Sequence, residues 1–146
     1  MTISAVVNVI RNNGRATPDD SYHTDKWILQ LVGHHYDPCP YNVDFDPEIH
    51  ENGLLTDWAQ ESLPHNGKVF VNPPYSSPQP WVTKAIQAME DGCTVVMLLK
   101  HDSSTRWYMD LREAGGQFMP IHRRLYHGRR TQASFPSVLV VLTLEK

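Results

Sequence analysis

The residues with the clearest chemical potential are Asn72, Pro73, Pro74 and Tyr75, which directly follow the apolar run Val69–Val71. A strand formed by that run must end at Asn72, because neither proline has an N–H and each fixes its own φ. Open α/β sheets bind ligands at the carboxyl ends of their strands. The Asn72 side-chain oxygen and the Pro73 carbonyl could there accept the two N–H bonds of a planar group with an exocyclic NH2, while Tyr75 stacks on its face. The alternative interpretation is a plain strand-ending turn with Tyr75 on the surface.

The chain has the size and composition of one globular domain. Its 146 residues are 40% hydrophobic, and a chain of this length buries roughly two-thirds of its unfolded surface. Asn12, Asn13 and Gly14 form a turn signal, which separates the first residues from the patterned part of the chain. We therefore expect residues 1–16 to form an N-terminal arm and residues 17–146 to form a single domain.

Charge is unevenly distributed along the chain, although the net charge is only −3. Residues 1–61 hold three basic and ten acidic side chains, whereas residues 101–146 hold seven basic and four acidic ones. Any surface that faces phosphate groups should therefore lie in the C-terminal third.

The two cysteines, Cys39 and Cys93, are too few for a disulfide framework and indicate a reducing compartment. We recognise no signal peptide and no apolar run long enough to cross a bilayer. These features predict a cytoplasmic protein without a membrane partner.

Helix and strand patterns alternate along the chain, which predicts an α/β fold. The continuous apolar run of residues 93–99 is typical of a strand buried on both faces of a parallel sheet, and its order after residues 69–72 and a helix predicts a right-handed βαβ unit. We expect a small Rossmann-like sheet, mostly parallel, with helices on both faces and the last strand at or near an edge. The expected helices span residues 17–33, about 80–91, and from Ser103 or Ser104 to about 114; the expected strands span residues 34–37, 69–72, 93–99, 117–121 and 137–144.

The segment Asn72–Tyr75 resembles the (Asp/Asn)-Pro-Pro-(Tyr/Phe) signature of amino-methyltransferases that use S-adenosylmethionine and act on adenine N6, cytosine N4 or a glutamine amide. Further blocks extend the resemblance over about residues 17–142, and together they are similar to the phage-encoded DNA N-6-adenine methyltransferase (Dam-like) family. These blocks are Thr-Pro before a helix, Asp-Pro-Cys, Asn-Gly-Leu-x-x-Asp-Trp, Pro-Trp-Val-x-Lys-Ala, Val-Met-Leu-Leu, Gly-Arg-Arg and Phe-Pro-Ser-Val-Leu-Val-Val.

The resemblance implies an S-adenosylmethionine-dependent methyltransferase fold and transfer of a methyl group to N6 of an adenine flipped out of double-stranded DNA. It implies that Asn72, Pro73, Pro74 and Tyr75 are catalytic, and that the cofactor contacts are Thr17, Pro18, Asp37, Pro38, Cys39, Asp57 and Trp58. The chain departs from the general methyltransferase pattern after Asp37, where a glycine-rich loop is replaced by Pro38-Cys39-Pro40. Asp37 and Asp57 could instead cap turns, and Trp58 could simply fill core volume.

A basic segment near the C-terminus is the candidate DNA contact. Arg123, Arg124, Arg129 and Arg130 surround His127-Gly128, and guanidinium groups suit both phosphates and guanine edges. Phe135 resembles a family aromatic that contacts the flipped base, with a core phenylalanine as the alternative. The arginines could also be a solvated loop paired to carboxylates. Histidine and cysteine spacing matches no structural zinc site, so no metal is expected.

Two other functions remain open from the sequence. One is methylation of a protein glutamine amide, whose planar NH2 would satisfy the same pocket. The other is a non-catalytic, degenerate methyltransferase fold that binds DNA or a partner, favoured by the missing glycines and by the small size. A homodimer would supply DNA-contact surface that one small chain lacks. If the protein is phage-encoded, its location is the host cell cytoplasm.

Overall fold

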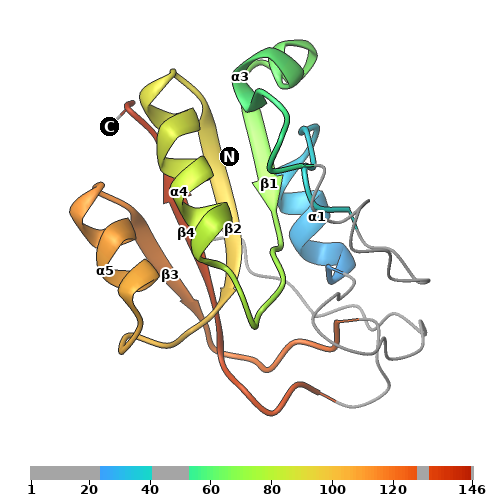
Figure 1. Cartoon of the computed structure of the whole chain (residues 1–146). Helices are drawn as coiled ribbons and strands as arrows, with labels where there is room; N and C mark the ends of the chain where they lie inside the picture. Colours follow the sequence, from blue (N-terminus) through green and yellow to red (C-terminus); the bar gives the residue numbers. More distant parts are fainter. Residues whose placement is uncertain (1–23, 41–52, 128–131, 146) are drawn as a thin grey trace.

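A computed structural model describes residues 24–40, 53–127 and 132–145 of the chain (Figure 1). Short helices precede the first strand, and helices and strands then alternate up to a final strand pair. In chain order the elements are α1 (Lys26–Val32), α3 (Trp58–Glu61), the 3-10 helix η1 (Leu63–His65), β1 (Lys68–Val71), α4 (Gln79–Glu90), β2 (Thr94–Lys100), α5 (Arg106–Glu113), β3 (Gln117–Ile121) and β4 (Ser137–Leu142).

The sheet is mixed, with the strand order β1-β2-β4-β3. β1 and β2 are parallel neighbours in the sheet, and α4 connects them in the chain. This arrangement confirms the predicted βαβ unit. Tyr36 adds an isolated parallel bridge to Val69, so the expected first strand lies beside β1 but is reduced to one residue. The α/β class is confirmed.

The prediction of a mostly parallel sheet is wrong, because β4 runs antiparallel to both β2 and β3. No helix lies among the described residues between β3 and β4, and Ile121 at the end of β3 pairs with Ser137 at the start of β4. A strand that returns from the same end of the sheet must run antiparallel. The last strand was predicted at or near an edge, and β4 lies one strand in from the edge strand β3, with all six of its residues buried.

Side chains alternate between two apolar layers along each central strand. On one face, Val95, Met97 and Leu99 of β2 pack with residues of α4 and α5, among them Trp81 and Leu111. On the other face, strand residues pack with Trp27, Ile28 and Val32 of α1. Helices therefore cover both faces of the sheet, as predicted (Figure 1).

Two predicted helix starts differ from the structure. α1 begins at Lys26, with Asp25 as its N-cap, so the expected helix does not run continuously from Thr17 to Gly33; Thr17 itself lies outside the described residues. α5 is capped by Thr105, whose Oγ1 accepts the Tyr108 N–H at 3.3 Å, and not by Ser103 or Ser104.

Strand direction decides where the connecting loops gather. β3 is antiparallel to β4 and β4 is antiparallel to β2, so β1, β2 and β3 all point the same way. The segments that follow these three strands therefore lie at one end of the sheet, whereas α3 lies at the other end, beside the start of β1 (Figure 1). None of the helices in the described part of the chain is long and apolar enough to cross a membrane.

Candidate active site

The Asn72 amide lies immediately after β1, which ends at Val71 as the two following prolines require. Its Nδ2 donates a hydrogen bond of 3.2 Å to Thr24 Oγ1, which comes from the segment just before α1. Pro73, the next residue, is buried. The bend thus holds an amide and a backbone carbonyl close together at the carboxyl end of the sheet, and the amide is oriented by a contact from a distant part of the chain.

Three aromatic rings from two loops meet next to this bend: Tyr75 follows β1, and His127 and Phe135 belong to the connection between β3 and β4. The ring centroid of Tyr75 lies 5.2 Å from that of Phe135 and 5.7 Å from that of His127, in edge-to-face geometry in both cases. His127 and Phe135 are stacked, with centroids 5.7 Å apart. Lys100 at the end of β2 places Nζ 5.5 Å from the Phe135 centroid. We call Tyr75, His127 and Phe135 the ring cluster; edge-to-face and stacked pairs of this kind are favourable arrangements for aromatic groups.

Asp25 fixes one member of the ring cluster. Its carboxylate accepts the backbone N–H groups of His127 at 2.8 Å and Tyr126 at 3.2 Å. The side chain is fully buried, and this burial raises its pKa, an effect that the two hydrogen bonds only partly offset. His127 has a left-handed backbone, with φ of 50°. A non-glycine residue in that region is uncommon, because the conformation is energetically unfavourable. The two hydrogen bonds to Asp25 therefore stabilise an unfavourable backbone conformation of this loop.

Asp37 lies beside β1, one residue after the Tyr36 bridge to Val69. Its Oδ1 accepts the Cys39 N–H at 3.0 Å, a turn of the kind that the sequence left open as an alternative. Burial raises the pKa of Asp37 and raises that of the Cys39 thiol to about 12. Pro38 is also buried and contacts Gly53: a Cβ added to Gly53 would lie 1.7 Å from the Pro38 carbonyl oxygen.

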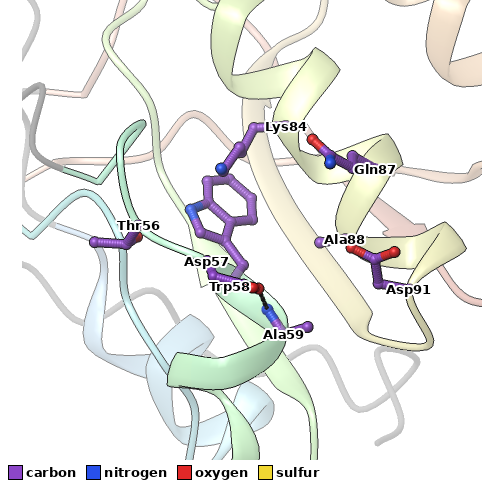
Figure 2. A pocket seen from close by; sticks show the side chains of 8 residues that line it. All are labelled: Thr56, Asp57, Trp58, Ala59, Lys84, Gln87, Ala88 and Asp91. Carbon is purple, nitrogen blue, oxygen red and sulfur yellow. Dashed lines mark hydrogen bonds between the residues drawn. The ribbon is translucent and has the colours of Figure 1, made fainter.

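Asp57 and Trp58 begin α3, which lies at the end of the sheet where β1 starts (Figure 1). The Asp57 carboxylate caps α3 by accepting the N–H groups of its second and third residues. Trp58 is 1% exposed, and its Nε1 donates to the Gly53 carbonyl at 2.7 Å. Both residues line a cavity of about 170 Å³ against Lys84 in the middle of α4 and Asp91, the C-cap of that helix (Figure 2).

The structure thus brings together part of the predicted site. Asn72, Pro73, Pro74, Tyr75 and Phe135 form one group, whereas α3, which begins with Trp58 and is capped by Asp57, lies at the other end of the sheet (Figure 1). Arg123 and Arg124 are exposed just after β3, at the same end of the sheet as Asn72. Thr17, Pro18, Arg129 and Arg130 lie outside the described residues. In the described ranges, no three His, Cys, Asp or Glu side chains are grouped so as to hold a metal ion.

Sequence reasoning missed Thr24, Asp25 and His127. A weak signal was present for the first two, because Thr-Asp one residue before the apolar pair Trp27-Ile28 is a helix-start pattern. The stronger Thr-Pro signal at Thr17 displaced it. For His127 the sequence carried no signal of its contacts, since its bond to Asp25 joins residues 102 positions apart.

Comparison with known proteins identifies the family. Residues 47–129 match the family model described as DNA N-6-adenine-methyltransferase (Dam). The chain is 30% identical over 114 residues to the DNA N-6-adenine-methyltransferase of Haemophilus phage HP1 (strain HP1c1), an alignment covering 67% of this chain and 60% of that protein. It is 40% identical over 126 residues to the DNA N-6-adenine-methyltransferase of Escherichia phage T1, covering 79% of this chain and 51% of that protein. The chain therefore spans between half and two thirds of the length of these curated relatives. Since the family model covers more than half of its residues, this chain belongs to the DNA N-6-adenine-methyltransferase (Dam) family.

Proposed function

We propose that this protein transfers a methyl group from S-adenosylmethionine to N6 of an adenine that is flipped out of double-stranded DNA. The observation that carries the proposal is the Asn72 amide held at the carboxyl end of β1 beside the ring cluster. The family and the names of the two phage relatives support adenine as the acceptor.

Asn72 and Pro73 would receive the exocyclic amine. With Nδ2 donating to Thr24, Oδ1 of Asn72 accepts one N6–H, and the Pro73 carbonyl accepts the other. Acceptors that are already in place when the base arrives make the amine nitrogen more electron-rich without reorganisation during the reaction. Transfer of a methyl group from a sulfonium is an in-line displacement, which mainly requires the reacting atoms to be aligned. No nucleophilic side chain is needed for it.

The ring cluster would receive the face of the base. Extruding a base from the duplex costs a few kcal/mol in lost pairing and stacking, which aromatic contacts in the enzyme partly replace. Tyr75 and Phe135 come from the loops after β1 and before β4, so their rings can contact the base from two directions.

Asp37 fits a positively charged methyl donor. Its carboxylate lies beside β1, and burial raises its pKa because the ionised form is poorly hydrated there. A nearby cation stabilises such an ionised carboxylate. Asp37, Pro38 and Cys39 would hold S-adenosylmethionine, which supplies an electrophilic methyl group on its sulfonium sulfur. The role of Asp57 and Trp58 in donor binding stays a prediction; Trp58 is linked to the Asp37 segment through Gly53, which accepts the Trp58 Nε1–H and contacts Pro38.

Arg123 and Arg124 are proposed phosphate contacts, together with Arg129 and Arg130.

A homodimer also belongs to the proposal, since two copies would present two basic loops to one duplex. Sedimentation with and without DNA measures the oligomeric state, and full turnover by a strict monomer would contradict the homodimer. The host cell cytoplasm is the proposed location, because the DNA substrate is there.

Nucleoside mass spectrometry tests the proposed reaction. Purified protein incubated with S-adenosylmethionine and unmethylated duplex DNA should produce N6-methyladenine. Asn72→Ala should lower the turnover rate at least about 100-fold, as loss of one preorganised polar group commonly does. Its affinity for S-adenosylmethionine should be retained. Asn66→Gly is the matched control, because Asn66 lies before β1 and has a φ of 56° that glycine adopts readily. Donor binding without N6-methyladenine would refute adenine as the acceptor and redirect the assay to protein glutamine.

A further inference from the structure

Thr24 and Asp25 contact two different segments of the candidate active site, which we call its two walls: the bend after β1 and the segment after β3. Thr24 Oγ1 accepts the Nδ2–H of Asn72, which follows β1. The Asp25 carboxylate accepts the N–H groups of Tyr126 and His127, which belong to the segment after β3. Two adjacent residues therefore connect the amide that would bind the amine to the loop that carries a ring of the cluster.

This pair of residues is anchored to the body of the protein. The Asp25 main-chain oxygen accepts the N–H groups of Ile28 and Leu29, so Asp25 is continuous with the first turn of α1. α1 is in turn held by Trp27, Ile28 and Val32, each at most 1% exposed, against the sheet. Movement of Thr24 relative to β1 would disturb that apolar layer, and the two walls consequently share one rigid support.

The Thr24 contact holds the Asn72 amide in one of its two orientations. An amide can turn over about its last torsion and exchange its oxygen for its NH2, because that torsion is broad and roughly two-fold. In the structure Thr24 Oγ1 accepts the hydrogen bond from Nδ2, so the amide lies in the orientation that turns its NH2 toward Thr24 and leaves Oδ1 as the atom on its other side. The reversed amide would present N–H groups to the N–H groups of an amine substrate.

The Asp25 contact controls the other wall. Its two oxygens each hold one N–H, and the second of these belongs to His127, which stacks on Phe135 and meets Tyr75 edge-to-face. A neutral amide at position 25 would offer only one acceptor oxygen to two donors. The loop would then lose one bond, and the rings would lose their fixed separation.

We propose that Thr24 and Asp25 are positioning residues, Thr24 by orienting the Asn72 amide and Asp25 by fixing the His127 loop that completes the ring cluster. The proposal rests on the proposed function for its effect on turnover. Its effect on geometry stands independently of that function.

Replacement of Thr24 by near-isosteric and by conservative residues separates the hydroxyl from the shape of the side chain. Thr24→Val should lower kcat about 10-fold or more, since small misplacements at a reacting centre have effects of this size, with an unchanged KM for S-adenosylmethionine. Thr24→Ser keeps the acceptor oxygen and should stay within about twofold of the parent, as a rescue of that loss. Thr105→Val is the control, because it removes a threonine hydroxyl that caps α5 by accepting the Tyr108 N–H.

A second readout follows the amide itself. In 15N–1H spectra, Thr24→Val should move the side-chain NH2 resonances of Asn72, whereas Thr24→Ser and Thr105→Val should leave them near their original positions. Asp25→Asn should move the backbone amide resonances of Tyr126 and His127. Unmoved resonances in Thr24→Val and Asp25→Asn would overturn the inference whether or not the protein methylates DNA. Moved resonances in a protein that forms no N6-methyladenine would support the inference and refute the proposed function instead.

Discussion

At the residue scale, Gly53 is a position where one added methyl group should strongly destabilise the fold. A Cβ there would meet the Pro38 carbonyl oxygen at 1.7 Å, a main-chain atom that cannot rotate away. Gly53→Ala should therefore lower the free energy of unfolding in urea by about 3 kcal/mol, at the upper end of overpacking effects. The Gly53 carbonyl also accepts the Trp58 Nε1–H, so a shift of this backbone would disturb a second buried contact.

Gly92→Ala is the control for that experiment. Gly92 has a φ of 102° and no atom within 4 Å of an added Cβ, so its replacement reports backbone strain without a steric clash. The loss should be about 1–2 kcal/mol. Equal losses at the two positions would contradict the role assigned to the contact between Gly53 and Pro38.

The buried Asp25 carboxylate predicts a particular pH dependence of stability. Burial raises its pKa in the folded protein above the unfolded value of about 3.8. The folded state therefore binds a proton more readily than the unfolded state, and this stabilisation is fully present below about pH 3.8 and is lost as pH rises through the folded pKa. Relative to Asp25→Asn, which does not titrate at this position, the parent should gain stability on acidification from pH 7. Urea unfolding of both proteins over that range measures the difference. A gain toward high pH would have the wrong sign.

The predictability of the site differs from residue to residue. The end of β1 at Val71 and the exposure of an amide there follow from two prolines, which act through their own covalent structure. Phe135 could be placed near Tyr75 only through the family resemblance. Asp25 and His127 could not be paired at all, because hydrogen bonds between segments 102 positions apart depend on the whole fold. The sequence therefore predicts features that depend on neighbouring residues, but it does not predict the long-range hydrogen bonds that hold the site together.

At the element scale, β4 shows the limit of reading a continuous apolar run. All six residues of β4 are buried, which a central strand requires in either direction. The run therefore predicts burial on both faces but carries no information about direction. Direction was decided by the connection from β3, which ends where β4 begins. A connection of residues 122–136 without a predicted helix was the available signal.

Trp58 supports a prediction about the attachment of α3. The indole is buried against Trp81 of α4, with ring centroids 6.4 Å apart, and its Nε1 donates to Gly53. Trp58→Phe keeps an aromatic ring but removes that donor, and it should cost about 1–3 kcal/mol through the lost hydrogen bond and the smaller ring. Chemical denaturation measures the cost. The same variant tests the predicted donor contact: an increased KM for S-adenosylmethionine with unchanged stability would favour cofactor binding over core packing.

At the scale of the whole molecule, charge and topology place a basic surface next to the proposed base pocket. β1 and β3 point the same way, so Arg123 and Arg124, which follow β3, lie at the same end of the sheet as Asn72. Both arginines are exposed. A duplex whose target adenine reaches Asn72 would therefore pass close to this loop, and its phosphates would be within range of guanidinium groups.

The salt dependence of DNA binding tests this arrangement. Each phosphate neutralised by a protein cation contributes about −0.9 to the slope of log K against log salt concentration, because counterions are released. Arg123→Ala and Arg124→Ala should each reduce the magnitude of that slope by about 1 and weaken binding on all sequences alike. Fluorescence anisotropy with a labelled duplex at several salt concentrations measures both quantities. Arg112→Ala is the matched control, because Arg112 is an exposed arginine in the last turn of α5, at the opposite end of the sheet. It makes the same change in net charge, so an equal loss of slope would mean that the total charge, and not the loop beside Asn72, determines DNA binding.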